Sequence, residues 1–171
     1  DNTNDTGQRA ADTASVPSDI PRALMRVFPE TDFSQTDPAL AQAISGGPPK
    51  DGIPAIDEPT FVPLSEFTRP DSVQAIVLED TDGVKVYPYN ILTWHEIVND
   101  SLDGTPVAIT FCPLCGSAIV FDRTLPDGTV STLGVSGWLL ESNMIMFDRA
   151  TETLWQQSTG QALAGTHYPS E

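Results

Sequence analysis

The sequence predicts a mainly β (α+β) fold, a small barrel or sandwich that carries a few short helices. Two observations support this class. Runs of apolar residues of strand length follow one another from Gln74 onward, separated by turn residues. In addition, 15 prolines and 12 glycines among 171 residues require many turns and disfavour long helices. The expected strands are residues 75–78, 84–87, 107–111, 118–121, 130–135 and 143–147.

Two Asp-Gly pairs predict hairpin turns between these strands. Asp82-Gly83 separates the first two strands, and Asp127-Gly128 separates the fourth from the fifth. Asp-Gly favours the tight two-residue turn whose twist matches that of paired strands. We therefore expect antiparallel pairing on both sides of each turn.

Short helices are expected before the strands. One covers residues 21–28 and places Leu24 on its apolar side. Another begins after Asp37, a suitable N-cap residue, with Pro38 at the first helical position, and continues to residue 44.

A third short helix is expected among the strands, over residues 90–98, with Asn90 as its cap. Apolar residues recur along it at helical spacing. We expect this stripe to face the core: Ile91, Trp94 and Val98.

One pattern occurs twice near the ends of expected strands. Asp122-Arg123 follows one apolar run, and Asp148-Arg149 follows another. Two copies are too few to indicate a repeat architecture. We expect these pairs to cap or bridge two similar hairpins, because structural ion pairs are commoner than catalytic ones.

A polar segment precedes the domain. Residues 1–19 contain little that could be buried, so we expect a flexible acidic tail, followed by a single globular domain over residues 20–171. Such a tail is what remains when a leader or a lipid-anchor signal is removed. We therefore expect an extracytoplasmic protein, secreted or held at the cell surface by an N-terminal lipid anchor. No apolar run approaches the roughly 20 residues of a transmembrane helix.

The charge is strongly acidic. Asp and Glu number 24 against 8 Lys and Arg, which gives a formal net charge of −16, and Lys50 and Lys85 are the two lysines. This composition argues against nucleic-acid binding, because no basic patch exists to release counterions from phosphates. Dense carboxylates with few lysines suit a high-salt solvent that screens their repulsion. We therefore expect a halophilic organism.

The two cysteines of the chain lie in the segment Cys112-Pro113-Leu114-Cys115-Gly116. Two sulfurs three positions apart on a tight turn can bind one metal ion, and the glycine supplies the backbone freedom that such a turn needs. Tetrahedral thiolate sites usually use four cysteines, and the second pair is missing here. The pair is therefore a metal site completed by other residues, a redox couple, or a plain disulfide.

Several motifs together resemble one family. The chain is similar to domain-of-unknown-function family 3179, whose members are exported bacterial and archaeal proteins. The resemblance covers residues from about 51 to the C-terminus and implies no assigned reaction. Its motifs are Trp94-His95-Glu96-Ile97-Val98-Asn99-Asp100, Phe111-Cys112-Pro113-Leu114-Cys115-Gly116, Gly134-Val135-Ser136-Gly137 and Met146-Phe147-Asp148-Arg149.

Two residues could complete a metal site with the sulfurs. His95 lies on the expected helix before the strand that carries Cys112, and the alternative is a half-buried histidine bonded to a carbonyl. Met146 could be a weak axial ligand, although a methionine in a β core is most often packing. Two thiolates, an imidazole and a thioether form a soft set that favours copper over zinc, since structural zinc needs four strong ligands.

The sequence therefore predicts an exported soft-metal protein that binds copper, with zinc as the alternative, for delivery, storage or electron transfer. The metal ion, and a redox or metal-accepting protein, would be its partners. A second hypothesis is thiol–disulfide redox chemistry, although Gly116-Ser117 leads into a strand rather than a helix. A third is a ligand-binding module with a structural cysteine pair. Whether the protein is an enzyme stays open, with a non-enzymatic role favoured.

Overall fold

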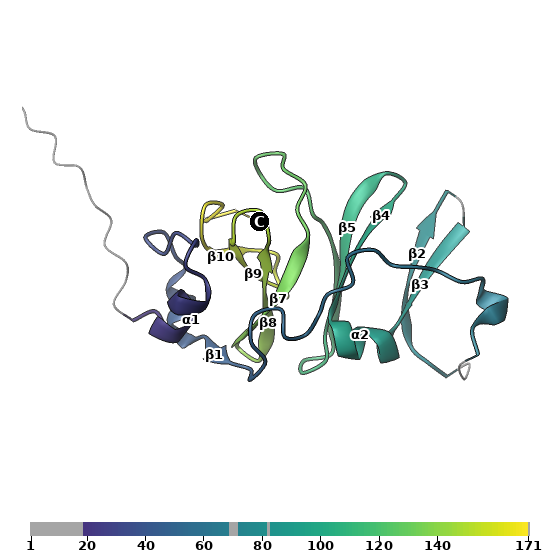
Figure 1. Cartoon of the computed structure of the whole chain (residues 1–171), viewed down its shortest axis with the longest axis horizontal. Coiled ribbons are helices and arrows are strands. Elements are labelled where there is room, and N and C mark those ends of the chain that lie inside the picture. Colours follow the sequence, from purple (N-terminus) through teal and green to yellow (C-terminus); the bar gives the residue numbers. More distant parts are fainter. Residues whose placement is uncertain (1–18, 69–71, 82, 171) are drawn as a thin grey trace, which may run out of the picture.

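The computed structural model describes residues 19–68, 72–81 and 83–170 (Figure 1). It confirms the mainly β class as a sandwich-like stack of three sheets, none of which closes into a barrel within this part of the chain. Helices and 3-10 helices are α1 (Arg22–Val27), η1 (Pro38–Gln42), η2 (Leu64–Glu66) and α2 (Tyr89–His95). The strands are β1 (Ile44–Ser45), β2 (Ala75–Asp80), β3 (Gly83–Pro88), β4 (Ile97–Leu102), β5 (Thr105–Cys112), β6 (Ser117–Asp122), β7 (Leu133–Leu140), β8 (Asn143–Asp148), β9 (Leu154–Gln156) and β10 (Ala162–Ala164).

The three sheets lie one beside the next along the molecule. A five-stranded sheet in the order β1-β7-β8-β9-β10 carries α1 on its outer side, the sheet β4-β5-β6 stands in the middle, and the hairpin β2-β3 lies at the far end (Figure 1). All neighbouring strands pair antiparallel.

Strand β5 separates two hydrophobic cores. Ala108 and Cys112 face the core shared with the five-stranded sheet, whereas Val107, Ile109 and Phe111 face the core shared with β2-β3 and α2. This follows from the alternation of side chains along a strand. Successive residues of β5 therefore face the two cores in turn, and Cys112 faces the core shared with the five-stranded sheet.

The N-terminal helices form nearly as predicted. Leu24 is fully buried on α1, and the Asp37 carboxylate accepts a hydrogen bond of 2.8 Å from the backbone N–H of Ala39. The second helix, however, is a 3-10 helix that ends at Gln42 instead of residue 44. It stops because Ile44 pairs with β7.

The expected helix 90–98 was too long, and of its predicted inward residues Ile91 and Trp94 are exposed, whereas Val98 is buried but lies on β4. Glu96 adopts a left-handed conformation with φ 58°, which ends α2 and lets Ile97 start β4. Pro88, not Asn90, is the N-cap. Leu92 is fully buried, whereas Trp94 is 75 % exposed, because a helix of two turns packs a single narrow face against the core.

Of the two predicted turns, the structure describes the one at Asp127-Gly128 in full and the one at Asp82-Gly83 only in part. Gly128 has φ 85°, and its N–H donates to Leu125 in a turn that leads to a bridge between Thr124 and Val130. The strand that follows starts at Leu133, later than expected. Asp82 lies outside the described residues, while β2 and β3 on either side pair antiparallel as predicted.

The predicted acidic tail, apart from Asp19, also lies outside the described residues. Among the helices of the described part, none has the length and apolarity that crossing a membrane requires.

Candidate functional site: the thiol pair at the end of β5

The two cysteines lie on a closed turn between β5 and β6. Cys112 is the last residue of β5, and Ser117 is the first residue of β6, as the strand context predicted. The N–H of Gly116 donates to the carbonyl of Cys112 at 2.8 Å, and Gly116 has φ 67°, a conformation that favours glycine. Both thiols are free; Cys112 is 1 % exposed, whereas Cys115 is exposed to solvent.

Cys112 is held inside the core between two sheets. Its thiol donates to the carbonyl oxygen of Ser142 at 3.9 Å, and the backbone N–H groups of Cys115 and Met144 act to lower its pKa. Burial raises the pKa of the Cys112 thiol, and contact with the Cys115 thiol raises it further. Cys112 therefore stays protonated when Cys115 ionises.

Cys115 is surrounded by uncharged hydrogen-bonding groups. Its sulfur lies 3.0 Å from Ser117 Oγ and accepts from Asn143 Nδ2 at 3.3 Å. Although burial acts to raise its pKa, hydrogen bonds from Ser117, Asn143 and Cys112 prevail and lower the pKa of Cys115 to about 7. The lowered pKa increases the share of thiolate at neutral pH.

A buried amide network fixes these donors. Asn143 Oδ1 accepts from the backbone N–H of Ser158 at 2.9 Å, so its Nδ2 must face Cys115 and Gln157. Gln157 is fully buried, and its Oε1 accepts from Asn143 Nδ2 and from Ser117 Oγ, each at 2.7 Å. Its Nε2 donates to Thr110 Oγ1 at 3.1 Å.

The hydroxyl of Ser117 carries one hydrogen and lies within hydrogen-bond distance of two acceptors, Gln157 Oε1 and Cys115 Sγ. It donates to Gln157 Oε1 while the Cys115 S–H donates to Ser117 Oγ. When Cys115 ionises, the hydroxyl can turn and donate to the thiolate, and Gln157 Oε1 keeps the hydrogen bond from Asn143. The thiol and the thiolate are therefore both satisfied without movement of the backbone.

Removing this hydroxyl gives a first prediction. We expect Ser117→Ala to raise the pKa of Cys115 from about 7 to about 8, because one hydrogen bond to the charged sulfur is lost. The rate of alkylation of Cys115 by iodoacetamide, measured against pH, gives the midpoint directly. Ser158→Ala is the matched control, since its backbone N–H is the group that the network uses. A midpoint that stays near 7 in Ser117→Ala would contradict the proposed donor.

The proposed third ligand, His95, lies at the end of α2 and bonds elsewhere. Its Nδ1 lies 2.8 Å from the carbonyl oxygen of Pro54. The N–H of Phe111 donates to the carbonyl of Glu96 at 2.8 Å, so the end of α2 lies beside the end of β5. The carbonyl contact is the alternative that the sequence left open for this histidine.

Met146 lies in the same buried cluster as Cys112, on β8, together with Met144. It also lines a cavity of about 580 Å³ next to Trp155 and Phe121. Across residues 19–68, 72–81 and 83–170, no three His, Cys, Asp or Glu side chains converge as ligands for a metal ion. The structure thus brings the two thiols together, with Met146 in their core, and does not join His95 to them in such a group.

Sequence reasoning missed three residues of the network: Ser117, Asn143 and Gln157. Each is a polar residue inside the core or at its edge, where apolar side chains are usual. Asn143 and Gln157 are 5 % and 0 % exposed. Their polarity at strand ends was the available signal. It could not be used, because the pairing of β6, β8 and the segment after β9 around one sulfur is a tertiary feature.

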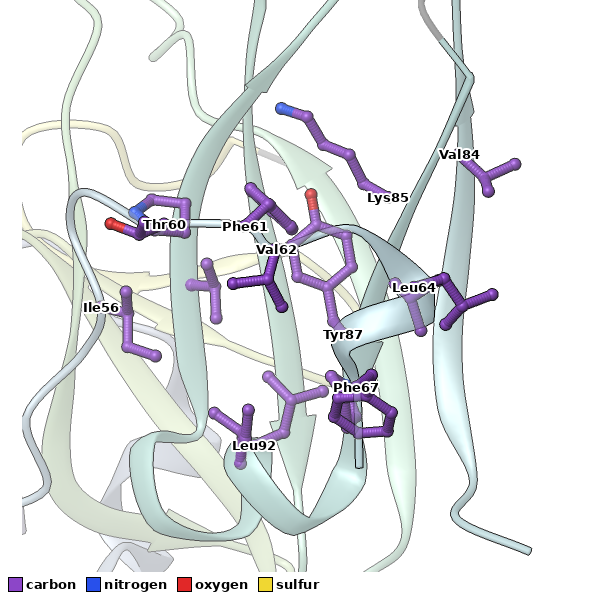
Figure 2. A pocket seen from close by; sticks show the side chains of 15 residues that line it. Ile56, Thr60, Phe61, Val62, Leu64, Phe67, Val84, Lys85, Tyr87 and Leu92 are labelled. Carbon is purple, nitrogen blue, oxygen red and sulfur yellow. The ribbon is translucent and has the colours of Figure 1, made fainter. Parts of the chain in front are cut away.

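A separate apolar cavity of about 360 Å³ lies between β3, α2 and the segment around η2 (Figure 2). Phe61, Leu64 and Leu92 are among the residues that line it. The polar groups at its wall are satisfied within the protein: Lys85 Nζ and Tyr87 Oη both bond the carboxylate of Asp100. Neither cysteine lines this cavity, so the thiol pair is a distinct, open site.

Comparison with known proteins gives a family and no reaction. The family model described as "Protein of unknown function (DUF3179)" matches residues 50–171, more than two thirds of the chain. The chain belongs to the DUF3179 family. All the site residues of this DUF3179 protein lie inside the matched part, whereas α1, η1 and β1 precede it. No curated protein and no solved structure matches the chain.

Proposed function

We propose that this DUF3179 protein carries out thiol–disulfide exchange, with Cys115 as the attacking thiol and Cys112 as the resolving thiol. The observation that carries this proposal is the pairing of an exposed thiol, held among uncharged donors, with a buried thiol in the same turn. The low pKa of Cys115 and the raised pKa of Cys112 agree with the two roles.

The reaction would proceed in two balanced steps. The Cys115 thiolate attacks one sulfur of a substrate disulfide, forms a mixed disulfide, and releases the other substrate sulfur as a thiolate that takes up a proton. Cys112 then loses its proton, attacks Cys115 Sγ, and releases the second substrate thiol. The protein gains a Cys112–Cys115 disulfide, and the substrate disulfide is reduced by the same two electrons. Run backwards, the steps oxidise a substrate dithiol.

The site activates its thiol without a helix. In thioredoxin-like proteins a helix N-terminus stabilises the thiolate, whereas here β6 follows the turn. Ser117 and Asn143 supply the stabilising hydrogen bonds instead. A pKa near ambient pH suits exchange, because a lower value would cost nucleophilicity and a higher one would leave too little thiolate. An oxidising extracytoplasmic compartment fits this chemistry.

The experiment is to mix reduced protein with a small disulfide such as hydroxyethyl disulfide and follow the products by mass spectrometry. We expect one intramolecular Cys112–Cys115 disulfide per chain, seen as the loss of two hydrogens, and two released substrate thiols. Protein that stays reduced under a large excess of disulfide, while Cys115 still reacts with iodoacetamide, would refute the proposal.

Soft-metal binding is a second candidate function, and one observation favours it. The two sulfurs share one tight turn, closed by the N–H of Gly116 on the carbonyl of Cys112, and such a turn can direct both sulfurs to one ion. Copper would suit this pair, with Met146 available in the same core as a weak ligand.

Elemental analysis of protein purified without chelator tests this candidate, with Cys115→Ser and His95→Ala beside the wild type. We expect bound copper to be lost in Cys115→Ser and retained in His95→Ala, because His95 bonds Pro54 instead. Equal loss in both variants would restore His95 as a ligand. Wild-type protein that holds no copper would remove the candidate.

A further inference from the structure

The contacts of the Cys115 sulfur are all uncharged. They are a hydroxyl, a side-chain amide, a second thiol and a backbone N–H. Many reactive cysteines instead owe their low pKa to a neighbouring Lys, Arg or protonated His, which also attracts anionic substrates. This site activates its sulfur by hydrogen bonds and so gains no attraction for anions.

Two arginines lie beyond the far ends of the strands that carry the site. Arg123 follows β6, which begins at Ser117, and Arg149 follows β8, which begins at Asn143. At about 3.3 Å per residue, each arginine is about 20 Å along its strand from the site residue. The two Asp-Arg pairs of the sequence thus mark the opposite end of the two strands that carry the site.

These cations are also engaged. Arg149 pairs with Asp51 and Asp57, while Arg123 donates to the backbone carbonyls of Asp100, Val107 and Ser131. The remaining lysines and arginines of the described part are Lys50, which pairs with Glu152, Lys85, which pairs with Asp100, and Arg22 and Arg26 on α1, at the outer side of the five-stranded sheet (Figure 1). Of the two histidines, His95 lies against the carbonyl of Pro54, and His167 is buried beside Trp155.

One acidic and one apolar side chain are exposed on the turns that form the site. Glu141 is exposed in the turn between β7 and β8, next to Ser142, whose carbonyl lies 3.9 Å from Cys112 Sγ. Leu114, directly before Cys115, is 68 % exposed. The whole chain carries a formal net charge of −16. An approaching anion therefore meets repulsion, whereas an uncharged or cationic group with apolar neighbours does not.

We propose that the site acts on disulfides in uncharged or basic polypeptide segments and, at low ionic strength, discriminates against anionic disulfides. This inference rests on the thiol–disulfide exchange proposed above and adds its substrate class. A polypeptide fits better than a small molecule because Cys115 lies on an exposed turn beside an apolar side chain, and lines neither of the two cavities.

Three peptides test the proposal. They carry the same disulfide flanked by Lys, Gln or Glu, and each exchange rate is divided by the rate with 2-mercaptoethanol, which removes the effect of the flanking charges on the leaving sulfur. At about 10 mM salt we expect the Lys peptide to react about tenfold faster than the Glu peptide. At about 1 M salt, where charges are screened within about 3 Å, the rates should converge.

Variants at Leu114 provide the matched control, because this exposed side chain takes no part in the network. We expect Leu114→Lys to speed the Glu peptide about threefold at low salt relative to Leu114→Gln, and Leu114→Glu to slow it by the same factor. Faster exchange with the Glu peptide in the wild type, or a preference that salt does not change, would overturn the substrate class alone.

Alkylation separates that result from failure of the exchange itself. Iodoacetamide and anionic iodoacetate report the charge preference of Cys115 without any disulfide. No exchange with any of the three peptides, together with normal reaction with iodoacetamide, would overturn the exchange function and the substrate class with it.

Discussion

Replacing Cys115 by serine is expected to abolish thiol–disulfide exchange, because the remaining thiol, Cys112, is 1 % exposed and has a raised pKa. A serine hydroxyl does not ionise near neutral pH, and Cys112 cannot reach a substrate disulfide from inside the core. Exchange of the reduced variant with hydroxyethyl disulfide, followed by mass spectrometry, measures the effect. A variant that still forms mixed disulfides would show that Cys112 can attack, contrary to its placement.

Cys112→Ala is the partner variant of this experiment. Alanine is chosen because it removes the sulfur and its hydrogen-bonding capacity together and keeps an apolar side chain in the cluster around Cys112. We expect Cys115 to attack normally and then to remain as a mixed disulfide, since the resolving thiol is gone. The two variants together separate attack from resolution, so each role is tested by a different product.

Gly137→Ala is expected to destabilise the fold by about 2–5 kcal/mol, the largest stability effect that we predict. Gly137 has φ 78°, and an added Cβ would lie 2.1 Å from the carbonyl oxygen of Pro48. The left-handed backbone costs an alanine about 1–2 kcal/mol, and forcing a methyl group against fixed backbone adds about 1–3 kcal/mol. Its carbonyl also accepts from the N–H of Gly46 at 2.8 Å, so the neighbouring chain cannot easily withdraw.

Gly128→Ala is the control that measures the conformational cost of placing alanine in a left-handed backbone. Gly128 has φ 85°, and nothing lies within 4 Å of the position of its Cβ. We therefore expect a loss of about 1–2 kcal/mol in this variant, from conformation alone. Urea unfolding of both variants gives the difference. Equal losses would show that the segment around Pro48 moves aside at little cost, and that the close approach does not hold it in place.

Much of the fold could be predicted from local sequence. Turn residues and apolar runs predicted β2, β3, β5, β6, β7 and β8, but not the strands β1, β4, β9 and β10. The Asp37 cap was recognised because capping uses neighbours along the chain. Residues 96–98 were mispredicted as helix because a helical spacing of apolar residues continued past Glu96. Pairing of Ile97 with Thr110 on β5 outweighed that local preference, as long-range β pairing often does.

In the candidate site, too, some features follow from local sequence and others from tertiary structure. The sequence by itself determined that one Cys-x-x-Cys turn follows a strand, that the chain is strongly acidic, and that its basic residues are few. Tertiary structure alone decided that Cys112 is buried and Cys115 exposed, and that Asn143 and Gln157 supply and orient the hydrogen bonds to the exposed sulfur. Composition and turn chemistry act between near neighbours and can be predicted from residue order. The environment of a thiol depends on which strands meet around it, and that depends on the packing of the whole chain.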